Sequence, residues 1–167
     1  MRSLCVIPAR GQSKRIPRKN IKEFCGKPII AYSIELALTS KLFDIVYVST
    51  EDEEIGQIAN QYGAIVIDRP PEMAEIGAPD CGTQEVMRHA LLDHDCEIAC
   101  CLYATAPLLT KAELKMGYLM LKDKQWRPWS FSMLDNPPRD AGQFYWGWRA
   151  SFINRHPMID RHSVMIP

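Results

Sequence analysis

Residues 4–20 have the sequence LCVIPARGQSKRIPRKN, in which a short apolar run leads directly into a strongly basic segment. The run from Leu4 to Ile7 holds only apolar residues and ends at Pro8, which is typical of a strand buried on both faces of a sheet. The segment after it carries five cationic side chains: Arg10, Lys14, Arg15, Arg18 and Lys19. This stretch therefore predicts a buried strand with a cluster of positive charge at its carboxyl end.

The following hundred or so residues repeat the alternation of strand and helix. Apolar runs predict strands at residues 45–48, 64–67 and 98–103, and helical periodicity predicts helices near residues 28–40, 52–62, 84–93 and 111–122. Such alternation predicts parallel strands joined by right-handed crossovers, so we expect an α/β chain folded as a three-layer α/β/α sandwich with a mostly parallel sheet. Ligands of such sheets bind at the carboxyl ends of the strands, which here means the segments after Ile7, Ser49 and Tyr103.

The basic segment has the ingredients of a phosphate-binding cradle. Gly11 permits close approach to the backbone and Ser13 offers a hydroxyl donor, while the surrounding cations would neutralise an anion. The segment contains neither GxGxxG nor GxxxxGK followed by Ser or Thr, so it is neither the dinucleotide fingerprint nor a Walker A loop. A solvated basic loop is the alternative, and the position directly after an apolar strand makes it less favoured.

Charge and composition narrow the class of ligand. Lys plus Arg and Asp plus Glu both number 20 in the 167 residues, yet seven of the cations and no acid fall in residues 1–22. A compact cationic site on a neutral chain suits a small anion better than a nucleic-acid polymer. No stretch approaches the ~18–20 consecutive apolar residues of a membrane span. The first apolar run is too short for a signal peptide, so a cytoplasmic protein is expected, with its six cysteines as thiols that are mostly small buried residues.

The alternation fades after residue 125. We expect a single domain over residues 1–167, with a regular α/β core at 1–125 and a Trp- and Pro-rich, irregular C-terminal part at 126–167. Short strands are expected within that part at Trp129–Met133 and Phe144–Trp146. Its four tryptophans either pack in the core and a lid or form an oligomer interface, because large aromatic side chains serve both purposes.

Several of these segments resemble one family. The sugar-acid cytidylyltransferases, which make CMP-activated nonulosonic acids, open on motifs similar to IPARGQSKRIPRKN (7–20), FCGKP (24–28) and AYSI (31–34). The resemblance continues in VSTEDEEI (48–55) and RP (69–70). The segments CLYATAP (101–107) and DAGQFYWG (140–147) are more similar to the pseudaminic acid branch than to the N-acetylneuraminate branch.

The resemblance implies a fold, a reaction and a cofactor. The fold is the Rossmann-like nucleotidyltransferase fold, with residues 1–125 as its nucleotide-binding core. In the reaction, CTP binds with Mg²⁺, and the anomeric hydroxyl of a sugar acid attacks the α-phosphorus, which releases pyrophosphate and forms a CMP-sugar. Such a transfer needs positioning and charge neutralisation more than covalent chemistry. The implied partners are therefore CTP and a small sugar acid.

The cradle and the resemblance together give a nucleotide site of nine residues: Ala9, Arg10, Gly11, Ser13, Lys14, Lys19, Asn20, Arg69 and Thr83. Within it, the resemblance gives Arg10 and Lys19 a catalytic role on the phosphates and puts Arg69 on the cytosine or ribose side. The structural alternative for Arg69 is an exposed loop cation paired with Asp68 or Glu72. For Thr83 the alternative is the N-cap of the following helix, and both roles are compatible.

The sequence departs from the family pattern in three ways. Gln12 stands where the family usually has a second Gly, which would cost on the order of 1 kcal/mol if that position has a positive φ. The stretch between Met133 and Asp140 is shorter than the family excursion that helps to form the sugar site and the dimer contact. The family's Mg²⁺-binding Asp-Ile-Asp motif would follow the position of Pro167, so no metal ligands are assigned.

These departures leave alternatives open. The late acids Asp135, Asp140 and Asp160 are expected in solvated or turn-forming roles rather than as metal ligands, because Asp beside Pro, Asn or Gly usually bonds the backbone. An alternative function is a protein that binds CTP or CMP, or a protein partner, without turnover. A homodimer that completes the site is a further alternative.

Overall fold

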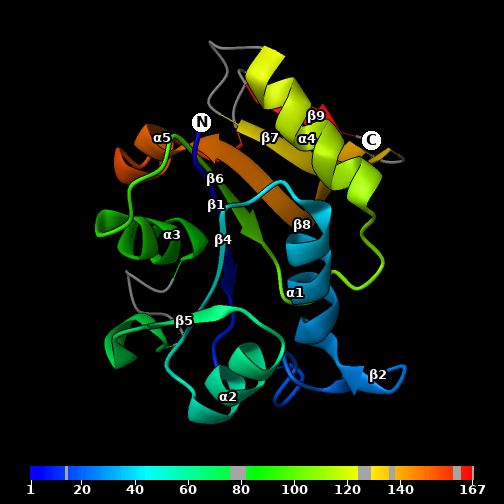
Figure 1. Ribbon diagram of the computed structural model, residues 1–167, viewed down its shortest axis with the longest axis vertical. Coiled ribbons are helices and arrows are strands. Elements are labelled where there is room, and N and C mark those ends of the chain that lie inside the picture. The colour runs from blue at the N-terminus through cyan, green and yellow to red at the C-terminus, as the bar shows by residue number, and fades with distance from the viewer. Residues whose placement is uncertain (14, 76–81, 124–128, 136–137, 160–162, 167) are drawn as a thin grey trace.

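The computed structural model describes residues 1–13, 15–75, 82–123, 129–135, 138–159 and 163–166 (Figure 1). Its strands are β1 (Ser3–Pro8), β2 (Glu23–Phe24), β3 (Lys27–Pro28), β4 (Ile45–Thr50), β5 (Ile65–Asp68), β6 (Ile98–Leu102), β7 (Trp129–Asp135), β8 (Pro138–Trp148) and β9 (Val164–Ile166). Its α-helices are α1 (Ile29–Ser40), α2 (Glu53–Gln61), α3 (Thr83–Leu92), α4 (Lys111–Asp123) and α5 (Arg149–Ile153), and a 3-10 turn spans Pro71–Met73.

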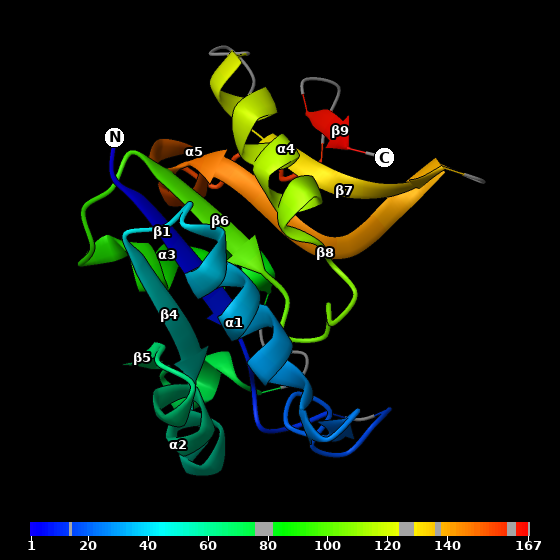
Figure 2. The ribbon, with the colours of Figure 1, turned by 45° about the vertical axis from the view of Figure 1, so that its right-hand side comes forward.

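Seven strands form one sheet in the order β5-β4-β1-β6-β8-β7-β9. Strands β5, β4, β1 and β6 pair in parallel, β8 runs antiparallel to both β6 and β7, and β9 is parallel to β7. The strands expected from the apolar runs are thus present, and the sheet is mostly parallel as predicted. Their carboxyl ends lie at one edge, where the loop after β1 is found at the lower end of the sheet in Figures 1 and 2.

Helices cover both faces of the sheet, which confirms the three-layer sandwich. One core packs α1, α2 and α4 against the face that carries Ile7, Val48 and Leu102. The other packs α3 and α5 against the opposite face, which carries Val6 and Cys101. Figure 1 shows the two sets of helices on opposite sides of the strands. Because β1 and β6 are buried on both faces, their sequences are continuous apolar runs rather than alternating ones.

The C-terminal part is more regular than the sequence predicts. Instead of two short strands, β7 and β8 form a long hairpin with a register shift between Phe131 and Met133, and β8 extends the sheet by pairing with β6. Figure 2 shows this hairpin as two curved arms that reach beyond α4. The aromatic residues of this part predict packing in a core, but they do not predict the hairpin. A register shift interrupts the alternation of inward- and outward-facing residues by which a strand is recognised in a sequence.

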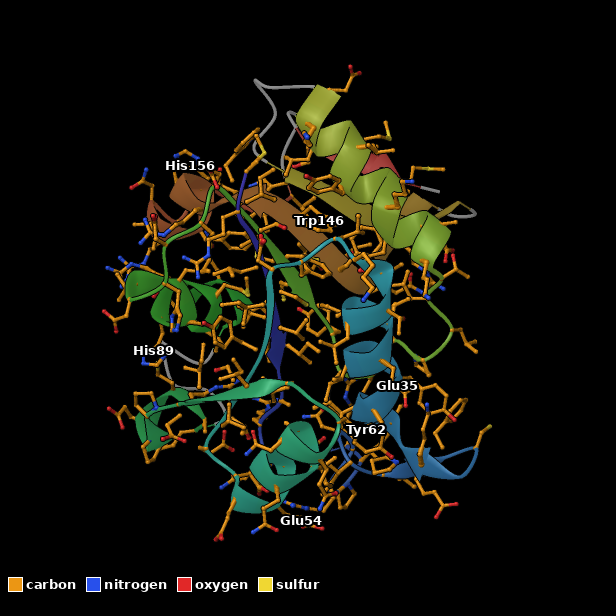
Figure 3. All side chains as sticks on the ribbon, viewed as in Figure 1. Glu35, Glu54, Tyr62, His89, Trp146 and His156 are labelled. Atoms are coloured by element: carbon orange, nitrogen blue, oxygen red, sulfur yellow. The ribbon has the colours of Figure 1, made fainter. Side chains whose placement is uncertain are left out.

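The described tryptophans support the core interpretation, although Trp148 is only half-buried against the core. The side chains of Trp129 and Trp146 are fully buried. The indole N–H of Trp146 donates to the backbone oxygen of Leu114 in α4 at 3.0 Å, and its ring stacks on Phe43 at 4.9 Å between centroids. Figure 3 labels Trp146 where β8 meets the helices. Trp126 lies outside the described residues.

Two smaller expectations concern membranes and thiols. Among the described helices, none has the length and apolar character needed to cross a bilayer.

The described cysteines are free thiols, as expected, and four of them are buried. Cys25 differs, because it is exposed in the turn between β2 and β3. Cys81 lies outside the described residues.

Candidate nucleotide-binding site

The loop after β1 is anchored to the end of β4. The Ala9 N–H donates to the backbone oxygen of Ser49 at 3.0 Å, and the Gly11 N–H donates to Oε1 of Glu51 at 2.7 Å. A Cβ built on Gly11 would lie 2.3 Å from Oδ2 of Asp52, so this position tolerates no side chain without a shift. Gly11 is therefore required for close approach of the loop to the β4–α2 turn.

Asn20 closes the loop at its other end. Its amide N–H donates to the backbone oxygen of Arg10 at 2.9 Å, and its own backbone oxygen accepts from the Ile30 N–H at 3.1 Å. The side chain is buried, with 4% of its surface exposed. Asn20 thus braces the loop from within. Gln12 is not among the described residues with positive φ, so the strain considered for that position does not arise.

The sequence predicts that Arg18 belongs to the cation cluster, but the structure shows that it does not. Its guanidinium makes a two-pronged contact with the carboxylate of Asp52 and a further contact with Glu54 at 2.5 Å. Asp52 is also the N-cap of α2, where it accepts from the Ile55 N–H at 3.0 Å. Figure 3 labels Glu54 on α2, at the foot of the molecule. Arg18 is therefore a clamp between the loop and α2, because its charge is already paired.

A cavity of about 770 Å³ opens beside the loop. It is lined by four cations, one acid, apolar side chains and hydroxyls: Arg10, Arg15, Lys19, Lys22, Glu23, Ile16, Phe24, Ile29, Ser13 and Thr105. Cations therefore outnumber acids in its wall. Of the predicted loop residues, Arg10, Ser13 and Lys19 line this cavity, whereas Lys14 lies outside the described residues.

A smaller cavity of about 230 Å³ adjoins the first and shares Arg10, Lys19 and Thr105 with it. Its other lining residues come from five segments: Pro8, Asn20, Arg69, Gly82, Thr83, Val86 and Tyr103. The structure thus brings Arg10, Lys19, Asn20, Arg69 and Thr83 together around one space. Ala9 and Gly11 are buried residues on either side of Arg10 in the loop next to this space.

The alternatives considered for two of these residues are wrong. Arg69 is not an exposed loop cation, because only 5% of its surface is accessible and its guanidinium donates to Oγ and O of Ser49 at 3.3 and 2.7 Å. Thr83 is not the N-cap of α3, a position that Gly82 occupies. Its hydroxyl instead lies 2.7 Å from the hydroxyl of Tyr103. Both side chains form part of the wall of the smaller cavity.

The electrostatics favour an anion in this space. Burial lowers the pKa of Lys19 below its ordinary value, and the guanidinium groups of Arg10 and Arg15 lower it further. Burial also lowers the pKa of Arg69, while the carboxylate of Glu51 opposes this shift. Buried cations that repel one another are stabilised by a bound negative charge. The geometry is therefore suited to a polyphosphate in contact with Arg10 and Lys19.

The described residues include no group of three or more His, Cys, Asp or Glu side chains arranged to hold a metal ion. Near the loop, Glu51 bonds Gly11 and Asp52 bonds Arg18. Asp140 bonds the Gly142 N–H at 2.9 Å, a turn-forming role as expected, and it also accepts from the Tyr145 hydroxyl. Asp160 and the side chain of Asp135 are not among the described parts of the chain.

The strand-end rule predicts ligand binding after β6, but the sequence pattern singles out no residue there. Tyr103 lines the smaller cavity and Thr105 lines both, and the strand-end rule was the signal that could have identified them. Glu51 and Asp52 were also missed as loop anchors. Their signal was weaker, because the contacts join positions about 34 to 40 residues apart.

A family model described as cytidylyltransferase matches residues 4–141. The chain belongs to this cytidylyltransferase family. A pseudaminic acid cytidylyltransferase of Campylobacter jejuni is 50% identical over 125 residues, which cover 71% of this chain and 52% of that protein. An N-acylneuraminate cytidylyltransferase of Oncorhynchus mykiss is 37% identical over 116 residues, or 70% of this chain and 26% of that protein.

A solved structure of CMP:2-keto-3-deoxy-manno-octonic acid synthetase complexed with CTP has a TM-score of 0.79 and 16% identity, covering 96% of this chain and 79% of that one. This likeness supports the nucleotidyltransferase fold expected from the sequence. The chain spans about half the length of the Campylobacter relatives that it matches. The activity and substrates of the whole protein are therefore matters for a proposal.

Proposed function

We propose that this protein transfers CMP from CTP to a nonulosonic sugar acid of the pseudaminic or sialic type and releases pyrophosphate. The observation that carries the proposal is the pair of adjoining cavities that share Arg10 and Lys19 at the carboxyl ends of β1 and β6. The 50% identity to pseudaminic acid cytidylyltransferases supports the pseudaminic type in particular. No feature of the described residues favours a protein that binds CTP without turnover.

In the proposed reaction the residues bind and orient more than they react. Arg10 and Lys19 contact the phosphates and neutralise the charge that builds up on the leaving pyrophosphate. The anomeric hydroxyl of the sugar acid forms a bond to the α-phosphorus as the bond to the β-phosphate oxygen breaks, and the hydroxyl proton is released. Arg69 and Thr83 hold the nucleoside in the smaller cavity, which keeps the α-phosphorus beside Lys19.

Mg²⁺ is part of the proposal as an ion that arrives with the triphosphate. Protein-bound Mg²⁺ commonly keeps several waters and uses substrate phosphates as ligands alongside one or two carboxylates. Of the described acidic residues near the loop, Asp52 pairs with Arg18, Glu51 accepts from the Gly11 N–H through Oε1 while its Oε2 is buried without a hydrogen-bond partner among the described residues, and Glu23 lines the larger cavity. Among the described residues these acids belong to no group of three or more arranged to hold a metal ion. We therefore assign no protein ligand to it and derive no step from it.

The proposed setting is the cytoplasm, where CTP is available. The free thiols of the described cysteines fit a reducing compartment. A homodimer is proposed as the assembly, supported by the exposed apolar side chains of Met116 and Leu119 on α4 and of Leu108 in the segment before it. Light scattering in solution tests the dimer, and a monomeric mass across the working concentration range contradicts it.

The first test of function is the variant Lys19→Ala. Thermal unfolding is measured with CTP, CMP, ATP, GTP and UTP, each with and without Mg²⁺. A ligand at 100 times its Kd adds roughly 2.7 kcal/mol of stability. For the wild type we expect this stabilisation with CTP and a larger one with Mg²⁺, and for Lys19→Ala we expect most of it to be lost.

Lys115→Ala is the matched control, because Lys115 is exposed on α4 and lies outside both cavities. It should bind CTP like the wild type. Unchanged CTP affinity in Lys19→Ala contradicts the site. Release of pyrophosphate from CTP in the presence of pseudaminic acid tests the reaction itself, and CTP binding without such release contradicts the proposed transfer to that acceptor.

A further inference from the structure

The first turn of α3 meets two different surroundings. Thr83 and Val86 line the smaller cavity, and the Thr83 hydroxyl lies 2.7 Å from that of Tyr103. Gln84 and Glu85, which stand between them in the sequence, contact a separate part of the chain. Because these four residues belong to one helical turn, whatever holds Gln84 and Glu85 also fixes the place of Thr83 in the cavity wall.

That separate part is the segment of residues 149–156, which contains α5 and lies beside α3 (Figure 1). Arg155 makes a two-pronged contact with the carboxylate of Glu85, with N–O distances of 2.5 and 3.0 Å. The side-chain amide of Gln84 donates to the backbone oxygen of His156 at 2.6 Å. Figure 3 labels His156 beside α5. Two adjacent residues of this segment thus hold two adjacent residues in the first turn of α3.

The same segment also contacts the other end of α3. The Arg149 guanidinium donates to the backbone oxygens of Leu91 and His94 at 2.9 and 3.2 Å. The segment therefore runs antiparallel to α3, with Arg149 at the carboxyl end of the helix and Arg155 at its amino end. Because the amino end of α3 lines the smaller cavity, Arg155 holds the end beside the site and Arg149 holds the remote end.

α5 is itself anchored in the aromatic core. Phe152 is fully buried and meets Trp129 of β7 edge to face, with 4.5 Å between ring centroids. A Cβ built on Gly147 of β8 would lie 2.4 Å from the Trp129 ring and 3.0 Å from Phe152, so this strand passes close against both rings. The segment therefore has a fixed position from which Arg155 can hold α3.

The contact between Arg155 and Glu85 is weak as a source of stability. The hydrogen bond from Arg155, opposed in part by burial, lowers the pKa of Glu85 below its ordinary value, so the pair is charged at neutral pH. The Arg155 side chain is 55% exposed, and solvent screens such a pair. Its effect on binding is of another kind, because a small displacement of a ligand-contacting group weakens its contact with the ligand.

We propose that Arg155 is a positioning residue, which holds the first turn of α3 so that Thr83 stays in contact with the nucleoside of CTP. This inference rests on the proposed function, which places the nucleoside in the smaller cavity. Without the guanidinium, the first turn loses its charged contact with the segment and shifts relative to the cavity. Arg155 touches no substrate and acts through Thr83.

The test is Arg155→Ala, with the Kd of CTP measured by titration calorimetry. We expect the Kd to rise roughly 2- to 5-fold, which corresponds to the loss of a partly exposed ion pair. Arg155→Lys keeps the charge without the two-pronged geometry, so it should recover part of this loss. Arg149→Ala is the matched control, because it removes an arginine of the same segment that holds the remote end of α3. It should lower the free energy of unfolding, measured by urea denaturation, without changing the Kd.

A second measurement separates positioning from a general structural effect. Arg155→Ala is combined with Thr83→Val, which removes the hydroxyl and keeps a side chain of similar shape. If Arg155 acts through Thr83, the double variant should bind CTP about as tightly as Thr83→Val alone. A purely structural role would instead raise the Kd by the same factor with and without the Thr83 hydroxyl.

The outcomes distinguish this inference from the proposed function. A wild-type protein that does not bind CTP contradicts the proposed function, and the inference falls with it. Where the wild type binds CTP, an unchanged Kd in Arg155→Ala or in Thr83→Val overturns the inference alone. Equal weakening with and without the hydroxyl also overturns it, as does a Kd that rises equally in Arg149→Ala. A raised Kd that depends on the Thr83 hydroxyl, with the control unchanged, supports it.

Discussion

On one side of the cavities, carboxylates of the β4–α2 turn position the loop after β1, whereas on the other side packed aromatic rings position β6 and β8. Glu51 and Asp52 bind Gly11 and Arg18 through partly exposed charged contacts. Trp146, by contrast, is fully buried against Phe43 and α4. Aromatic burial contributes far more stability than partly exposed ion pairs. The loop side should therefore govern binding, and the aromatic side should govern folding.

The largest expected effect is on the aromatic side. Trp146→Ala removes a buried indole that bonds Leu114 and stacks on Phe43, and we expect it to lower the free energy of unfolding by about 3–5 kcal/mol. Urea denaturation followed by circular dichroism measures the loss. Lys19→Ala in the same experiment should have nearly wild-type stability. A Trp146→Ala protein with the same free energy of unfolding as the wild type would contradict the comparison, because the aromatic side would then not be the main source of stability.

An intermediate effect is expected at the closest contact of the loop side. Gly11→Ala places a Cβ 2.3 Å from Oδ2 of Asp52, which must move and thereby weaken its cap on α2. Loss of a helix cap costs about 1 kcal/mol, so the free energy of unfolding should fall by about that amount. We also expect weaker CTP binding, measured by calorimetry, because the loop shifts with its anchor.

Gly56→Ala is the matched control for that variant. Gly56 lies inside α2, where the nearest atoms to an added Cβ are 3.7 Å away on Val66. Alanine is favoured over glycine in a helix by roughly 0.5–1 kcal/mol, so this variant should be as stable as the wild type or more so. If both glycine variants lose stability equally, the contact with Asp52 is not the cause.

The contrast between the two sides also explains what could be predicted from the sequence. The strands and helices before residue 125 have clear apolar periods, and the strand-end rule locates Arg10 and Lys19 at one edge of the sheet, while Thr83 was predicted from the family resemblance alone. The pairing of Arg18 with Asp52 was not predictable, because it depends on how a loop and a helix 34 residues apart meet. Adjacency of charged residues in a sequence does not show which of them are neutralised in the fold.

The same holds for the aromatic side. Tyr103, directly after β6, touches the Thr83 hydroxyl on one side and the ring of Tyr145 in β8 on the other, and the ring contact depends on the antiparallel register of β8 against β6. That register is set in the β7–β8 hairpin. The register shift within the hairpin interrupts the period-2 pattern, so the pairing of the strands cannot be predicted from the sequence. Local patterns therefore predicted the elements and the place of the site, while the partners of its side chains required the tertiary structure.

The smallest expected effect is that of Arg18→Ala, which removes the clamp between the loop and α2. Because Arg18 is 40% exposed at its side chain, solvent screens the pair, and we expect a loss of only about 0.5–1 kcal/mol at pH 7. Arg18→Lys keeps the charge without the two-pronged geometry, so it should recover part of that loss. Urea denaturation of the three proteins measures the difference.

The pH dependence of this loss identifies its origin. The hydrogen bond from Arg18, opposed in part by burial, lowers the pKa of Asp52 below its ordinary value. A carboxyl group with a lowered pKa in the folded state stabilises the fold above its unfolded pKa of about 3.9, and this contribution disappears as the pH falls and the group is protonated. The stability difference between wild type and Arg18→Ala should therefore be constant from pH 7 to about pH 5 and should shrink below about pH 4. A difference that stays the same at pH 3 would mean that Arg18 stabilises the loop by packing, and the loop side would then resemble the aromatic side more than its charges suggest.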